Sequence, residues 1–81
     1  MKTIDILLNK YGDKFVPLDR VAADYYAVND NRTINRMAVN GKFPGLKPFK
    51  ARESKAAPWL VDIENLANAL DSRAREYAKH N

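Results

Sequence analysis

Polar and basic side chains that suit nucleic-acid recognition gather in one part of the chain, between residues 31 and 55. Its first turns contain the amide, hydroxyl and guanidinium side chains of Asn31, Arg32, Thr33, Asn35 and Arg36. Arginine can pair with guanine, and asparagine with adenine, through two hydrogen bonds each. We therefore predict that these side chains contact base edges and phosphates of DNA, although the sequence does not identify the bases.

A basic strip, defined here as residues 41–55, follows directly. It has one acidic residue, Glu53, and its charge of +4 equals that of the whole chain. The basic residues of the strip are Lys42, Lys47, Lys50, Arg52 and Lys55. A basic strip between two nearly neutral segments is typical of a surface that binds a polyanion. Charge alone fits a solvated loop equally well.

The residues needed for catalysis are sparse. The one histidine, His80, is the penultimate residue, and the only serines are Ser54 and Ser72, so no nucleophile pairs with a base. The carboxylates are spread singly along the chain, and no glycine-rich phosphate loop or metal-ligand cluster appears. We predict a protein that is not an enzyme and that requires no metal or cofactor.

Length and composition predict one folded domain over residues 1–81, because the chain is short yet 46% hydrophobic. No run approaches the roughly 18 apolar residues of a membrane span, and the start lacks the apolar core of a signal peptide. Cysteine is absent, which removes disulfides and thiolate metal sites. A cytoplasmic protein without membrane contact is expected.

Two helices are predicted before the polar segment. The first has Thr3 as N-cap and Gly12 as its stop, and a brief extended entry at residues 15–16 leads to a second helix from Pro17 to about Tyr26. The residues expected on the inward faces are Ile4, Leu7, Leu8 and Tyr11, then Leu18, Val21, Ala22 and Tyr25.

A third helix is predicted from about Arg32 to Asn40, with Asp30 or Asn31 as N-cap and Gly41 as a left-handed stop. Its inward face comprises Ile34, Met37 and Ala38, so the reading side chains point outward. The second and third helices, joined by the polar turn "AVNDN", form a candidate helix-turn-helix. The alternative is a helical hairpin that binds no DNA.

Prolines interrupt the helical pattern after Gly41, and two short strands, at residues 49–52 and 59–61, flank the loop "ESKAA". This hairpin, or wing, carries the basic strip. The residues expected to pack it onto the helices are Phe43, Leu46, Phe49 and Trp59. Trp59 could instead stack on a base, but core packing is favoured in so small a domain.

A last helix is predicted with Asp62 as N-cap and an apolar stripe made of Ile63, Leu66, Ala67, Leu70, Ala74 and Tyr77. The stripe beyond Leu70 could be core or could serve dimerisation. The predicted fold class is mainly α with a small β-hairpin, a winged helix-turn-helix of about four helices.

Two quoted runs carry a resemblance to a known family: "VPLDRVAADYY" and "TINRMAVNGKFPGLKPFKARESKAAPWLVDIENLANALDSRA". They resemble the pyocin activator protein PrtN family, which has a "VPL" entry to a helix, a helix ending in glycine and a basic residue, a "SQK"-like loop and a "DLAxYLDxRR"-like closing helix. The run "TINRMAVNGKFP" is also similar to the "TvrRxxxxGxLP" core of the winged-helix excisionase and Cox-type proteins of phages, whose fold is MerR-like. Val39 departs from the pattern, because an apolar residue occupies a position that is usually polar and exposed in it, and this leaves the register of the third helix open.

Both resemblances imply a DNA-binding protein from a prophage or mobile element. The first implies a transcriptional activator, with double-stranded DNA as partner, and adds RNA polymerase as a candidate. The second implies an excisionase that binds and bends DNA to control the direction of recombination. A homodimer and a cooperative array on DNA both stay open. A third alternative is a protein-interaction module, which the scarcity of acidic residues between 31 and 55 disfavours.

Overall fold

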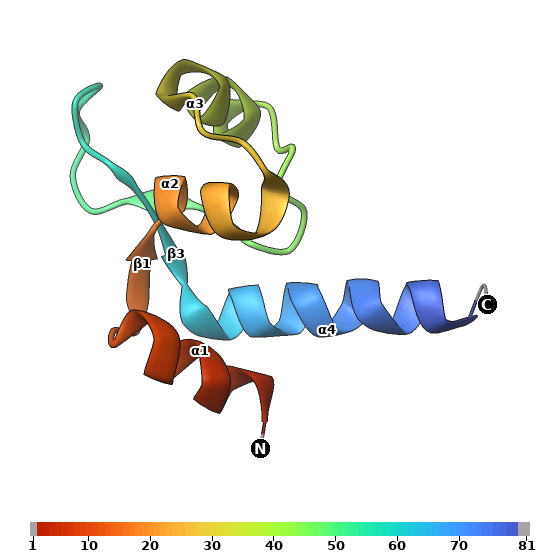
Figure 1. The fold of residues 1–81 in the computed structure, drawn as a ribbon. Coiled ribbons are helices and arrows are strands. Elements are labelled where there is room, and N and C mark those ends of the chain that lie inside the picture. The colour runs from red at the N-terminus through yellow and green to blue at the C-terminus, as the bar shows by residue number, and fades with distance from the viewer. Residues whose placement is uncertain (1, 80–81) are drawn as a thin grey trace.

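The computed structural model describes residues 2–79, which form four helices and a three-stranded antiparallel sheet (Figure 1). The elements in chain order are α1 (Thr3–Tyr11), β1 (Phe15–Pro17), α2 (Leu18–Val21), η1 (Ala22–Tyr26), α3 (Asn31–Val39), β2 (Phe49–Lys50), β3 (Trp59–Asp62) and α4 (Ile63–Lys79). The π-helical turn η1 continues α2 directly, so the two form one helix. The mainly helical class with a small sheet is confirmed, and the layout is compatible with a winged helix-turn-helix.

The sheet has the strand order β1-β3-β2. The hairpin of β2 and β3 agrees with the predicted wing, although β2 ends at Lys50 rather than Arg52. Residues 15–16 were expected only to be extended and Pro17 to begin the second helix, but Phe15–Pro17 form a third strand in which Val16 lies opposite Val61. Residues that lie opposite each other in paired strands face the same side of a sheet. Both valines therefore point to its inner face, where they are buried. The sheet therefore ties the segment before α2 to the second strand of the wing.

The core lies between the inner face of the sheet, α1, the α2–η1 helix, α3 and the first turns of α4. Its buried side chains are Leu7, Tyr11, Val16, Leu18, Val21, Ala22, Ile34, Phe43, Leu46, Val61, Ile63, Leu66 and Ala67. Phe43 and Leu46 pack as predicted, and Trp59 is half-buried against the core. The prediction was wrong for Phe49, which is 38% exposed and packs edge-on against Phe15 on the outer face of the sheet.

The start of α1 differs from the predicted cap. Lys2 occupies the N-cap position, and its backbone N–H donates to the carboxylate of Asp5. The hydroxyl of Thr3 instead donates a 2.6 Å hydrogen bond to Asp71 on α4. This bond holds the two helices together across the chain. The predicted stop is confirmed, because Gly12 has the left-handed φ of 71° that a non-glycine side chain adopts at a cost.

The turn η1 shifts the register of the second helix. The backbone N–H of Ala27 donates to the carbonyl of Ala22, five residues earlier, which adds one residue to the turn. Tyr26 therefore packs edge-on against Phe43, with a centroid distance of 5.3 Å, and burial raises its pKa. Tyr25, predicted to face the core from a 3.6-residue period, is 39% exposed.

Helix α4 begins as predicted and then leaves the core. The carboxylate of Asp62 accepts a 2.9 Å hydrogen bond from the backbone N–H of Glu64, as an N-cap residue does. Leu66 is fully buried, whereas Tyr77 is 63% exposed. The apolar stripe is thus core in its first half only, and Figure 1 shows the second half extending past the other helices.

Candidate nucleic-acid interface

Helix α3 exposes a polar face whose residues differ in how they are held. Successive side chains turn by about 100° around a helix, so Arg32, Arg36 and Val39 share the centre of the outward face, while Asn35 lies on its flank. All four are exposed, Val39 to 67%. The buried Ile34 and the half-buried Met37 lie on the opposite side. The predicted register is confirmed, and Val39 belongs to the exposed face.

Thr33 is a capping partner in this structure. Its hydroxyl donates a 2.7 Å hydrogen bond to the carboxylate of Asp30, which also accepts from the backbone N–H of Thr33. These bonds, the one from the hydroxyl first, lower the pKa of Asp30 below its ordinary value. Of the two predicted caps, Asp30 is the N-cap, and Asn31 is the first residue of the helix. Thr33 therefore supports the helix end from which the neighbouring side chains project.

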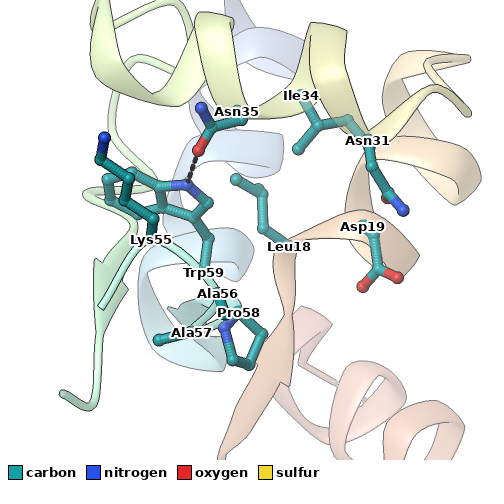
Figure 2. A pocket seen from close by; sticks show the side chains of 10 residues that line it. All are labelled: Leu18, Asp19, Asn31, Ile34, Asn35, Lys55, Ala56, Ala57, Pro58 and Trp59. Atoms are coloured by element: carbon teal, nitrogen blue, oxygen red, sulfur yellow. Dashed lines mark hydrogen bonds between the residues drawn. The ribbon is translucent and has the colours of Figure 1, made fainter. Parts of the chain in front are cut away.

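Asn35 connects α3 to the wing. The indole N–H of Trp59, on β3, donates a 2.9 Å hydrogen bond to Oδ1 of Asn35, as Figure 2 shows. The two residues are far apart in the sequence, so local patterning gave no sign of this contact. Trp59 was predicted to be either a core residue or a base-stacking residue. In the structure its ring packs against the core, while its indole N–H reaches Asn35 on α3.

A cavity of about 330 Å³ lies between α3, the start of α2 and the wing (Figure 2). Leu18 and Ile34 form its apolar floor, and Asn31, Asn35 and Lys55 are among the residues around it. The structure therefore places one predicted lysine of the wing and two predicted asparagines of the helix around the same cavity.

The other lysines of the basic strip divide into two groups. Lys50 is half-buried, donates a 3.1 Å hydrogen bond to the carbonyl of Ser54, and lies over the Trp59 ring. Lys42 and Lys47 are exposed, but they belong to the loop before β2, not to the wing. In that loop the carbonyl of Leu46 accepts a hydrogen bond from Asn65 on α4.

Arg52 and Lys55 are exposed in the loop that joins the strands of the wing. Within residues 2–79, ion pairs form between Lys10 and Asp24 and between Arg73 and Glu76, and none involves the basic strip. The cations of the strip, like Arg32 and Arg36 of α3, thus have no carboxylate partner in the described chain. Unneutralised cations on two adjacent elements make a positive surface that can attract phosphates.

The side chains weighed for catalysis serve local structure. Ser54 accepts a hydrogen bond from the backbone of Ala56, Ser72 accepts one from Arg75, and His80 lies outside the described residues. Burial, followed by the bond to Asp24, raises the pKa of Tyr11. Across residues 2–79, no three His, Cys, Asp or Glu side chains gather to hold a metal ion. None of the helices in this range has the length and apolar character to cross a membrane.

Comparison with known proteins gave one family. The model described as Pyocin activator protein PrtN matches residues 3–77, from the first turn of α1 to the last turns of α4. This match confirms the first resemblance seen in the sequence and covers both the helices and the wing. No curated protein and no solved structure matched the chain.

Proposed function

Because the chain belongs to the pyocin activator protein PrtN family, we propose that it is a transcriptional activator that binds specific sequences in double-stranded DNA. Residues 1–81 act as one winged helix-turn-helix domain in this proposal. The α2–η1 helix and α3 form the helix-turn-helix, and β2 and β3 form the wing. RNA polymerase is the second partner that activation requires.

In this proposal α3 enters the major groove. Arg32 and Arg36 are exposed one turn apart on its outward face, and an arginine at such a position can pair with guanine through two hydrogen bonds. Asn35 lies beside them on the flank that faces the wing. These three side chains read bases, while Thr33 supports the start of the helix through Asp30 and Asn31, exposed at the first helical position, contacts a phosphate.

The wing and the loop before it supply attraction to the phosphates. Arg52 and Lys55 contact the backbone on the wing side of α3, and Lys42 and Lys47 contact it from the neighbouring loop. Lys50 holds the wing in shape through its hydrogen bond to the Ser54 carbonyl and its cation–π contact with the Trp59 ring. The observation that carries the proposal is the adjacency of exposed, carboxylate-free cations on α3 and on the wing.

Selection of bound fragments from genomic DNA, followed by titration on the selected site and on a scrambled duplex, tests the proposal. We expect tight binding to one promoter-proximal site and activation of the adjacent promoter. In Arg36→Ala the difference in binding free energy between the two duplexes should fall by about 1 to 3 kcal/mol. Arg73→Ala removes the same charge from α4, where Arg73 pairs with Glu76, and should bind as the parent does.

Equal binding to both duplexes by the parent protein would reject sequence-specific recognition. An extended array of protected sites beside an attachment site would replace activation with the excisionase role. Absence of binding to any duplex would favour a protein-interaction module.

A further inference from the structure

The hydrogen bond between Trp59 and Asn35 determines which atom Asn35 can present to DNA. An indole nitrogen is a donor only, so the carboxamide atom that faces it must be the oxygen. That oxygen, Oδ1, lies 2.9 Å from the indole nitrogen. Figure 2 shows the amide nitrogen of Asn35 pointing away from the ring. The nitrogen and its two N–H donors thus point away from the indole, while the oxygen, which keeps one free lone pair, is held toward the wing.

The indole is itself held in place from several directions. Its ring packs against the core, and Trp59 pairs with Lys50 in the register of the wing. The ammonium of Lys50 lies 5.0 Å from the ring centroid and is fixed by its bond to the Ser54 carbonyl. A half-buried ring in a paired strand cannot follow Asn35 if that side chain rotates. The orientation of the amide is therefore set before DNA binds.

Recognition of adenine by asparagine needs both ends of the amide side by side. The oxygen accepts from the N6 amino group while the nitrogen donates to N7. Oδ1 could still accept with its second lone pair. An amide held with its oxygen toward the wing and its nitrogen away from it does not turn the edge that carries both atoms to one base, so it offers only the second of these bonds. Guanine presents two acceptors, N7 and O6, in the same groove, and thymine presents O4, whereas cytosine presents an amino donor.

We propose that Trp59 is a positioning residue that converts Asn35 into a donor-only reader, which favours guanine or thymine over adenine and cytosine at the contacted position. This inference rests on the proposed function and specifies the base class that the same helix reads. It replaces the adenine pairing expected from the residue type alone.

The test is selection of bound sequences from a randomised duplex by the parent and by Trp59→Phe, which keeps an aromatic ring but has no N–H. Release of Oδ1 should shift the preference at one position from guanine or thymine to adenine. The relative affinity for adenine at that position should rise by about fivefold or more, which corresponds to one hydrogen bond of about 1 kcal/mol. The preferences at the positions read by Arg32 and Arg36 should stay as they are in the parent.

Asn35→Ala and the double variant Asn35→Ala/Trp59→Phe complete a double-mutant cycle with the parent and Trp59→Phe. Asn35→Ala should remove the preference at that position, and adding Trp59→Phe should then change nothing there. A purely structural role for Trp59 would lower affinity for every sequence without changing the preferred base. A denaturant melt of Trp59→Phe shows whether that variant is folded. If it is not folded, a titration of Asn35→Ala alone still measures the contribution of the donor contact to binding.

The outcomes separate the two proposals. A parent protein that selects no sequence contradicts the proposed function. A parent that selects a defined site with adenine at the position lost in Asn35→Ala overturns the donor-only assignment while leaving the proposed function standing. An unchanged preference in a folded Trp59→Phe variant overturns the positioning role of Trp59.

Discussion

The ammonium of Lys50 lies 5.0 Å from the centroid of the Trp59 ring and donates to the carbonyl of Ser54 at 3.1 Å. Both contacts lie within the wing, so this cation is used in shaping the hairpin. Arg52, two residues later, is exposed in the loop beyond β2. Neighbouring cations of one basic strip therefore differ in their contacts, although the sequence gives no reason to separate them.

Salt titrations should detect that difference. Each phosphate contact contributes about −0.9 to the slope of log affinity against log salt concentration. Arg52→Ala and Lys55→Ala should each flatten the slope by about one unit on selected and scrambled DNA alike. Lys50→Ala should leave the slope close to that of the parent while weakening the fold. A slope near zero for the parent would argue against nucleic-acid binding altogether.

Leu66→Ala should cost roughly 2 to 5 kcal/mol of unfolding free energy, because the side chain is fully buried where α4 meets the core. Tyr77→Ala, on the exposed half of the same helix, is the control and should melt close to the parent. Denaturant melts followed by circular dichroism measure both. Equal midpoints for Leu66→Ala and the parent would show that the core lies elsewhere.

The N-cap of α3 should make stability depend on pH. Hydrogen bonds from Thr33 hold the pKa of Asp30 below its ordinary value of 3.8. The folded state thus binds the proton more weakly, so the stabilisation is present above that value and is lost as pH falls through the folded-state pKa. Asp30→Asn keeps an accepting oxygen but cannot titrate.

The difference in melting temperature between the parent and Asp30→Asn, measured from about pH 6 down to about pH 3, should narrow below about pH 4. Asp24, whose pKa is lowered mainly by the hydrogen bond from Tyr11, titrates in both proteins and cancels in this difference. A difference that stays constant over the whole range would mean that the carboxylate of Asp30 does not support the helix.

Val39 should contact a thymine methyl group if α3 lies in the major groove. It is 67% exposed on the face of Arg32 and Arg36, and an apolar side chain can read the C5 methyl of thymine. Replacing thymine by deoxyuridine at single positions of the selected site should weaken parent binding at one of them by about 1 kcal/mol. Val39→Ala should be insensitive to that replacement. Equal sensitivity of both proteins would exclude the contact.

The sequence predicted most of the local structure because that structure depends on neighbouring residues. Gly12 and Gly41 ended their helices at a positive φ, Asp62 capped α4, and Ile34 faced inward. Each of these features follows from the conformational preference or spacing of residues within one or two turns. The candidate binding residues on α3 were found in the same way.

The features that were missed depend on contacts between distant residues. The pairing of β1 with β3 joins Phe15 to Asp62, and a run as short as residues 15–17 carries no period that could reveal a strand. The π-helical turn η1 places Tyr25 outward. The prediction placed it inward because it assumed a period of 3.6 residues, which does not allow for a π-helical turn. The bond from Trp59 to Asn35 joins residues whose types each suggested a separate role.

The strand β1 also closes the α2–η1 helix, α3 and the wing into one loop. The backbone N–H of Ile63 donates to the carbonyl of Lys14 at 2.8 Å, and β1 pairs with β3 directly beside this bond, so the segment from residue 15 to residue 62 starts and ends at the same place. Closing such a loop has an entropic cost that local helix formation does not repay, so closure is expected to come late in folding. A fragment limited to residues 18–58 would lack the closure and should not hold the two elements proposed to contact DNA in their relative positions.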